Sequence, residues 1–108
     1  MAFNEQLAER LRRHLKDADV TEKHMFGGVA FLIQGNMALG VTGDELMVRV
    51  GPDAYEECLA LPNAREMDFT GRALKGFIYV SPAGIGVSTE FAAWIQRGVA
   101  FALSLPPK

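Results

Sequence analysis

The sequence predicts an α+β domain in which helices cover one face of a mostly antiparallel five-stranded sheet. Three observations support this fold class. Apolar residues recur with helical spacing at both ends of the chain, segments with a two-residue repeat lie between them, and glycine-containing turns separate these segments. The elements follow the order helix, three strands, helix, two strands, helix, which lacks the regular strand-helix alternation of a parallel α/β sheet.

The first helix is predicted by apolar residues that recur every four positions, at Phe3, Leu7, Leu11 and Leu15. It ends at Asp17-Ala18-Asp19. Acidic residues lie near its start and a basic run, residues 12–16, lies near its end, which suits the helix dipole. We therefore interpret the basic run as a solvated helix face rather than as a phosphate-binding patch.

Three strands are expected between residues 29 and 50. The continuous apolar run at 29–33 predicts a central strand, and a two-residue hairpin turn at Gly35-Asn36 follows it. The next strand places Met37, Leu39 and Val41 on one face. The third strand, residues 46–50, alternates, which places Met47 and Arg49 together on the face opposite Leu46, Val48 and Val50.

A short helix begins at Gly51-Pro52-Asp53 and ends at Pro62. Residues 65–69 alternate as an edge strand with Met67 pointing inward, a loop covers 70–75, and residues 76–80 form the fifth strand. Residues 81–86 are expected to interrupt the regular secondary structure again. The final helix has a sheet-facing stripe that consists of Phe91, Trp94, Ile95, Val99 and Ala102.

The second face of such a sheet carries apolar side chains as well, at Met47, Tyr79 and either Phe69 or Phe77. An uncovered apolar face invites a partner, and we expect a symmetric homodimer.

The bulk composition excludes several classes of protein. The net charge of −2 gives no electrostatic footprint for a polyanion, so we do not expect direct nucleic-acid binding. Cys58 is the single cysteine, which fits a reducing compartment, and the chain holds no apolar run long enough for a membrane span. We therefore expect a cytoplasmic protein. His14, His24 and Cys58 do not have metal-site spacing, and we expect neither a metal nor a cofactor.

Several blocks in chain order resemble the N-terminal domain of the TfoX/Sxy family. They are Met25-Phe26-Gly27-Gly28, the glycine-turn hairpin, residues 46–50, Gly71-Arg72, residues 75–80 and the final helix with Trp94. The resemblance covers nearly the whole chain and implies an α+β fold of the order given above. In the better-known members it also implies a role in natural competence, together with the cyclic-AMP receptor protein. Those members carry a second, C-terminal helical domain. We expect the present sequence to be a single domain, residues 1–108, without one.

A set of cationic residues is the candidate ligand site: Lys23, Arg49, Arg72 and Lys75. We expect several of them to meet at one sheet edge, where guanidinium groups bind carboxylates or phosphates in a bidentate manner. The alternative is that they pair within the fold with Asp53, Glu66 or Asp68.

We expect no catalytic site, because His24 has no evident carboxylate or nucleophile partner and Cys58 lies on an apolar helical stripe as an inert thiol. Gly27-Gly28 lacks the lysine and hydroxyl of a phosphate loop. The leading hypothesis is a non-enzymatic regulatory or interaction domain. The alternative is a sensor or enzyme for a small anionic metabolite that uses the cationic set.

Overall fold

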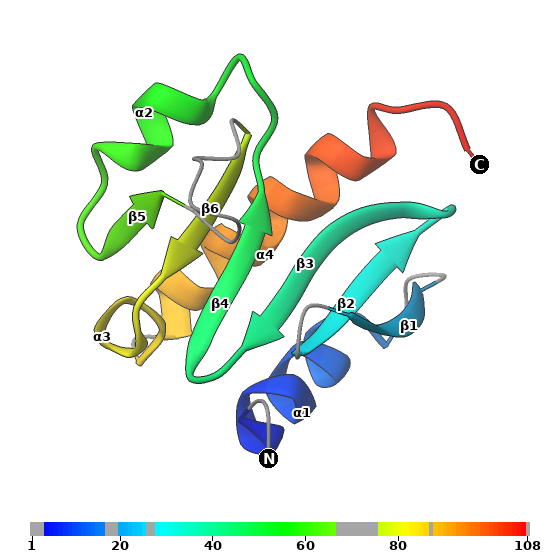
Figure 1. Ribbon diagram of the computed structural model, residues 1–108, viewed down its shortest axis with the longest axis horizontal. Coiled ribbons are helices and arrows are strands. Elements are labelled where there is room, and N and C mark those ends of the chain that lie inside the picture. The colour runs from blue at the N-terminus through cyan, green and yellow to red at the C-terminus, as the bar shows by residue number, and fades with distance from the viewer. Residues whose placement is uncertain (1–3, 17–19, 26–27, 67–75, 87, 108) are drawn as a thin grey trace.

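The structure of the chain is a computed structural model that describes residues 4–16, 20–25, 28–66, 76–86 and 88–107. Within these residues the elements are α1 (Glu5–His14), β1 (Val20–Met25), β2 (Gly28–Ile33), β3 (Asn36–Thr42), β4 (Glu45–Arg49), α2 (Tyr55–Leu59), β5 (Ala64–Glu66), β6 (Phe77–Val80), α3 (Pro82–Ile85) and α4 (Ser88–Leu103). Figure 1 shows the strands as one curved sheet with α4 passing behind it and α1 below.

The sheet confirms the predicted α+β class. Its strands lie in the order β1-β2-β3-β4-β6-β5, and every neighbouring pair is antiparallel. It has six strands where five were predicted. The additional strand is β1, an edge strand whose residues Thr21, Glu22, Lys23 and His24 are all exposed, so it lacks the alternation of a half-buried strand. The predicted break at 81–86 also contains a helical turn, α3, with a proline near its start.

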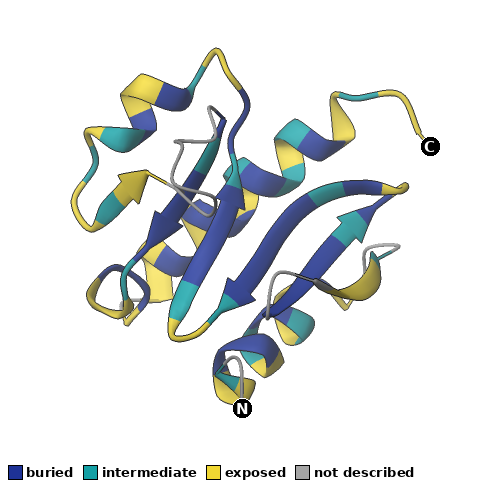
Figure 2. Ribbon diagram, in the orientation of Figure 1, coloured by how far each residue is buried: buried dark blue, intermediate teal, exposed yellow. Residues whose placement is uncertain are grey.

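The main core lies between the sheet and the helices. α4 packs on β3 and β4, and α1 packs on α4 and β3. The side chains of Leu7, Leu11 and Leu15 are buried as predicted, and so are those of Phe91, Trp94, Ile95 and Ala102, whereas Phe3 lies outside the described residues. Figure 2 shows that burial is concentrated on β2, β3, β4 and β6 and on the inner side of α4.

The β2–β3 hairpin is present, but its turn is displaced by one residue from the prediction. Ile33 pairs with Asn36, so the turn residues are Gln34 and Gly35, with φ angles of 54° and 84°. Both turn positions thus have positive φ, as a primed hairpin turn requires. Asn36 is held in β3 instead, 2% exposed, where its side-chain amide donates to the Pro106 carbonyl at 2.9 Å.

A β-bulge at Ala38 corrects the predicted face of Met37. Phe31 pairs with Leu39 and Leu32 pairs with Met37, which leaves Ala38 as the extra residue of β3. The bulge reverses the alternation. Leu39 and Val41 lie in the main core, whereas Met37 packs with Met47 on the other face of the sheet.

Apolar side chains do stand on that second face, as the sequence predicts. Met47 and Tyr79 form a cluster there with Phe77 and Met37 packed against it. Within the single chain, Met47 is 3% exposed and Tyr79 is 5% exposed. These two side chains are thus already buried within the single chain. Their burial does not require a second copy, and the homodimer stays a prediction. Met67 and Phe69, also predicted near this sheet, lie outside the described residues.

Candidate functional site

Arg49 is the predicted site residue whose side-chain contacts the structure defines. It is the last residue of β4, and its guanidinium carbon lies 5.5 Å from the ring centroid of Phe77 and 5.2 Å from that of Phe101. Phe77 is its cross-strand partner on β6, and Phe101 reaches it from α4. Arg49 Nη1 also lies 3.5 Å from the Met37 carbonyl oxygen. The cation therefore lies near two aromatic rings at the end of an interior strand.

Glycines at the end of the strand allow this arrangement. Gly51 has φ +88°, and a Cβ there would lie 2.3 Å from the Phe101 ring, so only glycine lets the ring approach the chain this closely. The backbone amides of Val50 and Gly51 donate to the Gly76 carbonyl at 2.8 Å and 3.1 Å. These contacts fix α4 and the start of β6 around Arg49.

The ion-paired alternative raised by the sequence named Asp53, Glu66 and Asp68, of which Asp68 lies outside the described residues. In the described parts of the chain the ion pairs are Arg12 with Glu9, Arg12 with Glu22, and Arg65 with Glu45, and none of them involves Arg49. A half-buried guanidinium that has no ion-pair partner among the described residues can bind a carboxylate or phosphate of a ligand through its N–H groups.

The other members of the predicted cationic set do not join Arg49 in the described residues. Lys23 lies on β1, and both β2 and β3 separate that strand from β4. Arg72 and Lys75 lie outside the described residues. Sequence reasoning missed Phe101 because the contact depends on where α4 crosses the sheet.

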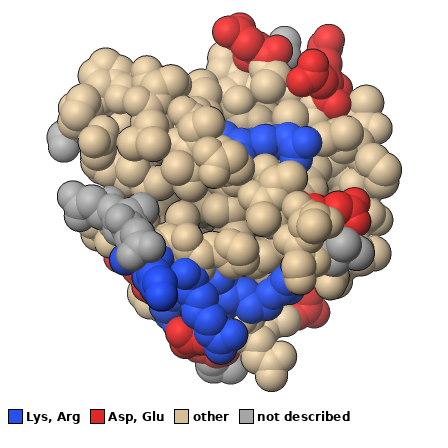
Figure 3. All heavy atoms as spheres, turned by 180° about the vertical axis from the view of Figure 1, so that it is seen from behind, with Lys and Arg blue, Asp and Glu red and all other residues tan. Residues whose placement is uncertain are grey.

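In the basic run at residues 12–16, Arg13, His14 and Lys16 are exposed, as expected for a solvated helix face, whereas Arg10, before the run, has structural contacts. Arg10 Nη1 donates to the Ile85 carbonyl at 2.9 Å, and its guanidinium lies 4.0 Å from the Phe91 ring centroid. His14 packs edge-on against the same ring at 5.1 Å. Figure 3 shows Lys and Arg side chains gathered in a strip at the bottom of the molecule, over α1.

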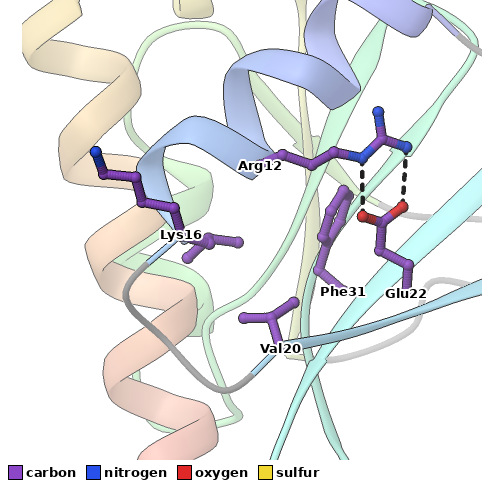
Figure 4. A pocket seen from close by; sticks show the side chains of 6 residues that line it. Arg12, Lys16, Val20, Glu22 and Phe31 are labelled. Carbon is purple, nitrogen blue, oxygen red and sulfur yellow. Dashed lines mark hydrogen bonds and ion pairs between the residues drawn. The ribbon is translucent and has the colours of Figure 1, made fainter.

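Arg12 ties α1 to the edge strand β1. Its Nε and Nη2 donate to the two carboxylate oxygens of Glu22 at 2.8 Å and 2.9 Å. These residues line a hollow of about 190 Å³ with Phe31 in its wall. Figure 4 shows Arg12 extending toward Glu22, while the ammonium of Lys16 points away. The hydrogen bond from Arg12 holds the pKa of Glu22 below its ordinary range.

We expect Glu22→Gln to lower the free energy of unfolding by no more than about 1 kcal/mol near neutral pH, because both partners are 35% exposed. The folded-state pKa of Glu22 is lowered, so its stabilisation is present above the ordinary glutamate pKa of about 4.3 and is lost as the pH falls through the folded pKa. Urea unfolding at neutral and strongly acidic pH measures this difference. Glu56→Gln, on an exposed position of α2, is the control. If the difference in free energy of unfolding between wild type and Glu22→Gln grew as the pH falls, the lowered pKa of Glu22 would be contradicted.

Two polar groups on α2 are buried. Cys58 is 3% exposed, and burial raises the pKa of its thiol, as expected for the inert residue that the sequence predicts. The Tyr55 hydroxyl is buried and has no hydrogen-bond partner among the residues that the structure describes, and burial raises its pKa as well. Sequence reasoning gave no signal for this buried hydroxyl.

Together, the fold and the contacts of Arg49 define a small α+β domain with an arginine beside two aromatic rings at the end of an interior strand. The model of the TfoX N-terminal domain matches residues 9–102, and the chain belongs to this family. No curated protein and no solved structure matches the chain.

The described residues contain no group of three or more His, Cys, Asp or Glu side chains that could hold a metal ion. None of their helices is both long enough and apolar enough to cross a membrane. The cytoplasmic location stays a prediction.

Proposed function

We propose that this chain is a regulatory interaction domain that acts by binding a protein partner and catalyses no reaction. The observation that carries the proposal is the family match over residues 9–102. In the better-known members of the TfoX family, the resemblance implies a role in natural competence together with a transcription regulator. We extend to this chain the general role, which is partner binding in transcriptional regulation. The aromatic-held Arg49 supports it, because arginines among aromatic side chains are frequent hot spots of protein interfaces.

Affinity capture from cells of the source organism, grown in several media, tests this function. We expect the tagged chain to retain one regulatory protein in comparable amount. Gly98→Val, which is expected to disturb the packing of α4 on β3, is the control, and we expect it to retain less of a partner that recognises the folded surface. Recovery of the tagged chain alone in every medium would contradict the proposal.

A second candidate function is favoured by the guanidinium of Arg49, which forms no ion pair with a carboxylate in the described residues. In it, the domain senses a small anionic metabolite, and Arg72 and Lys75 belong to the same proposed site. A thermal-shift screen with citrate, inorganic phosphate and pyrophosphate tests it. A ligand at about 100 times its Kd stabilises by about 2.7 kcal/mol.

For this second candidate we expect the shift to disappear in Arg49→Ala and to persist in Arg13→Ala, which removes an exposed arginine of α1. Arg72→Ala and Lys75→Ala test the two remaining residues. A flat screen, or a shift that Arg49→Ala retains, would remove the metabolite function and leave the interaction function as it stands.

A further inference from the structure

A groove runs between α2 and α4 on the helical side of the molecule. It consists of two neighbouring hollows. The larger has a volume of about 330 Å³ and is lined mainly by apolar side chains, among them Val50, Ala54, Ala100 and Phe101. The smaller, of about 100 Å³, is lined by residues that include Leu61, Pro62, Ala93 and Trp94. We call the two hollows together the α2–α4 groove.

Arg97 lines both hollows and so stands between them. Its guanidinium carbon lies 4.6 Å from the ring centroid of Trp94, its predecessor by one helical turn. In the part of the chain that the structure describes, Arg97 belongs to none of the ion pairs. The groove therefore presents a half-buried cation, supported by an aromatic ring, with an apolar recess on each side.

The complement of this pattern is a carboxylate flanked by apolar side chains. A carboxylate can bind the guanidinium in a bidentate manner, and its desolvation beside the Trp94 ring strengthens the pair. The recesses bury apolar side chains, with room for a large one near Phe101 and a small one near Pro62. Glu57 and Glu90 also line the two hollows, so additional acidic residues at the flanks would be repelled.

We propose that the α2–α4 groove is the docking site for a segment of a partner protein in which an aspartate or glutamate lies between two apolar residues. The proposal rests on the interaction function and names the surface that carries it. Arginine is one of the residue types that most often dominate binding energy at interfaces.

The test uses a phage-displayed library of random dodecapeptides selected on the wild-type chain, followed by fluorescence anisotropy with the synthetic peptides that emerge. We expect the selected peptides to share an apolar–acidic–apolar pattern. Their affinity should fall at least about tenfold for Arg97→Ala and for Ala100→Glu, which places a carboxylate in the groove.

Ala92→Glu is the matched control. Ala92 and Ala100 are both exposed on α4, but only Ala100 lines the groove, so the two variants add the same charge to the same helix. We expect Ala92→Glu to bind the peptides within about twofold of wild type. Circular dichroism and urea unfolding verify that all three variants are folded.

Three outcomes would overturn the proposal: selection without a shared pattern, selected peptides that lack a carboxylate, or equal binding to Ala92→Glu and Ala100→Glu. If the wild type has a solution mass above that of the monomer and Ala100→Glu is a monomer, the groove binds a second copy of the chain instead. If a captured partner binds Ala100→Glu as it binds wild type, the groove is excluded while the interaction function stands.

Discussion

Replacing Phe91 with alanine is expected to lower the free energy of unfolding by about 3–5 kcal/mol. The side chain is fully buried on the inner side of α4. Its loss removes apolar burial and leaves a cavity, and it also removes the ring on which the Arg10 guanidinium lies at 4.0 Å and His14 packs at 5.1 Å. One residue thus connects α1 to α4. Urea unfolding followed by circular dichroism measures the loss.

Leu103→Ala is the control for this change, because Leu103 lies in the last turn of the same helix and is 53% exposed. Its free energy of unfolding should stay within about 0.5 kcal/mol of wild type. A loss below about 1 kcal/mol for Phe91→Ala would show that α1 and α4 are not packed together through this ring.

Gly98→Val is expected to destabilise the domain by about 3 kcal/mol, the upper end of the range for overpacking. At Gly98, α4 lies close against β3, and a Cβ there would lie 2.5 Å from the carbonyl oxygen of Ala38 and 2.9 Å from the side chain of Leu39. The backbone of a central strand cannot yield locally. The helix would have to move away from the sheet, which would disturb the main core.

Gly86→Ala gives the comparison for Gly98→Val. A Cβ at Gly86 has the Pro82 carbonyl oxygen as its nearest neighbour, at an ordinary 3.8 Å, and we expect a change of less than about 1 kcal/mol. Chemical denaturation of both variants measures the difference. Equal stability of Gly98→Val and wild type would contradict the close helix–sheet contact.

The spacing of apolar residues predicted the helices and strands in which one face is buried and the other is exposed to solvent. The four-residue repeat of Leu7, Leu11 and Leu15 reports the buried stripe of α1, and the alternation in β4 placed Met47 and Arg49 on one face. It failed at Ala38, because a bulge adds one residue without any change in composition. It also failed at β1, whose exposed edge gives no apolar repeat.

The candidate site was predictable only in part. The strand pattern identified Arg49 as a cation next to an apolar face. Its second aromatic neighbour, Phe101, is 52 positions away and meets it only because Gly51 lets α4 pack against the strand end. The sequence pattern did not identify Arg97, because this polar residue lies outside the apolar, core-facing stripe of α4. The one-turn spacing of Trp94 and Arg97 was the available signal for their stacking.

Photo-crosslinking in living cells tests most directly whether this domain works by binding a partner through its helical side. A benzophenone amino acid is placed at Ala100, in the α2–α4 groove, and separately at Ala92, on the same helix outside it. The account predicts a crosslink to one protein from position 100 and none to that protein from position 92. The absence of a crosslink from position 100, or the same set of products from both positions, would contradict it.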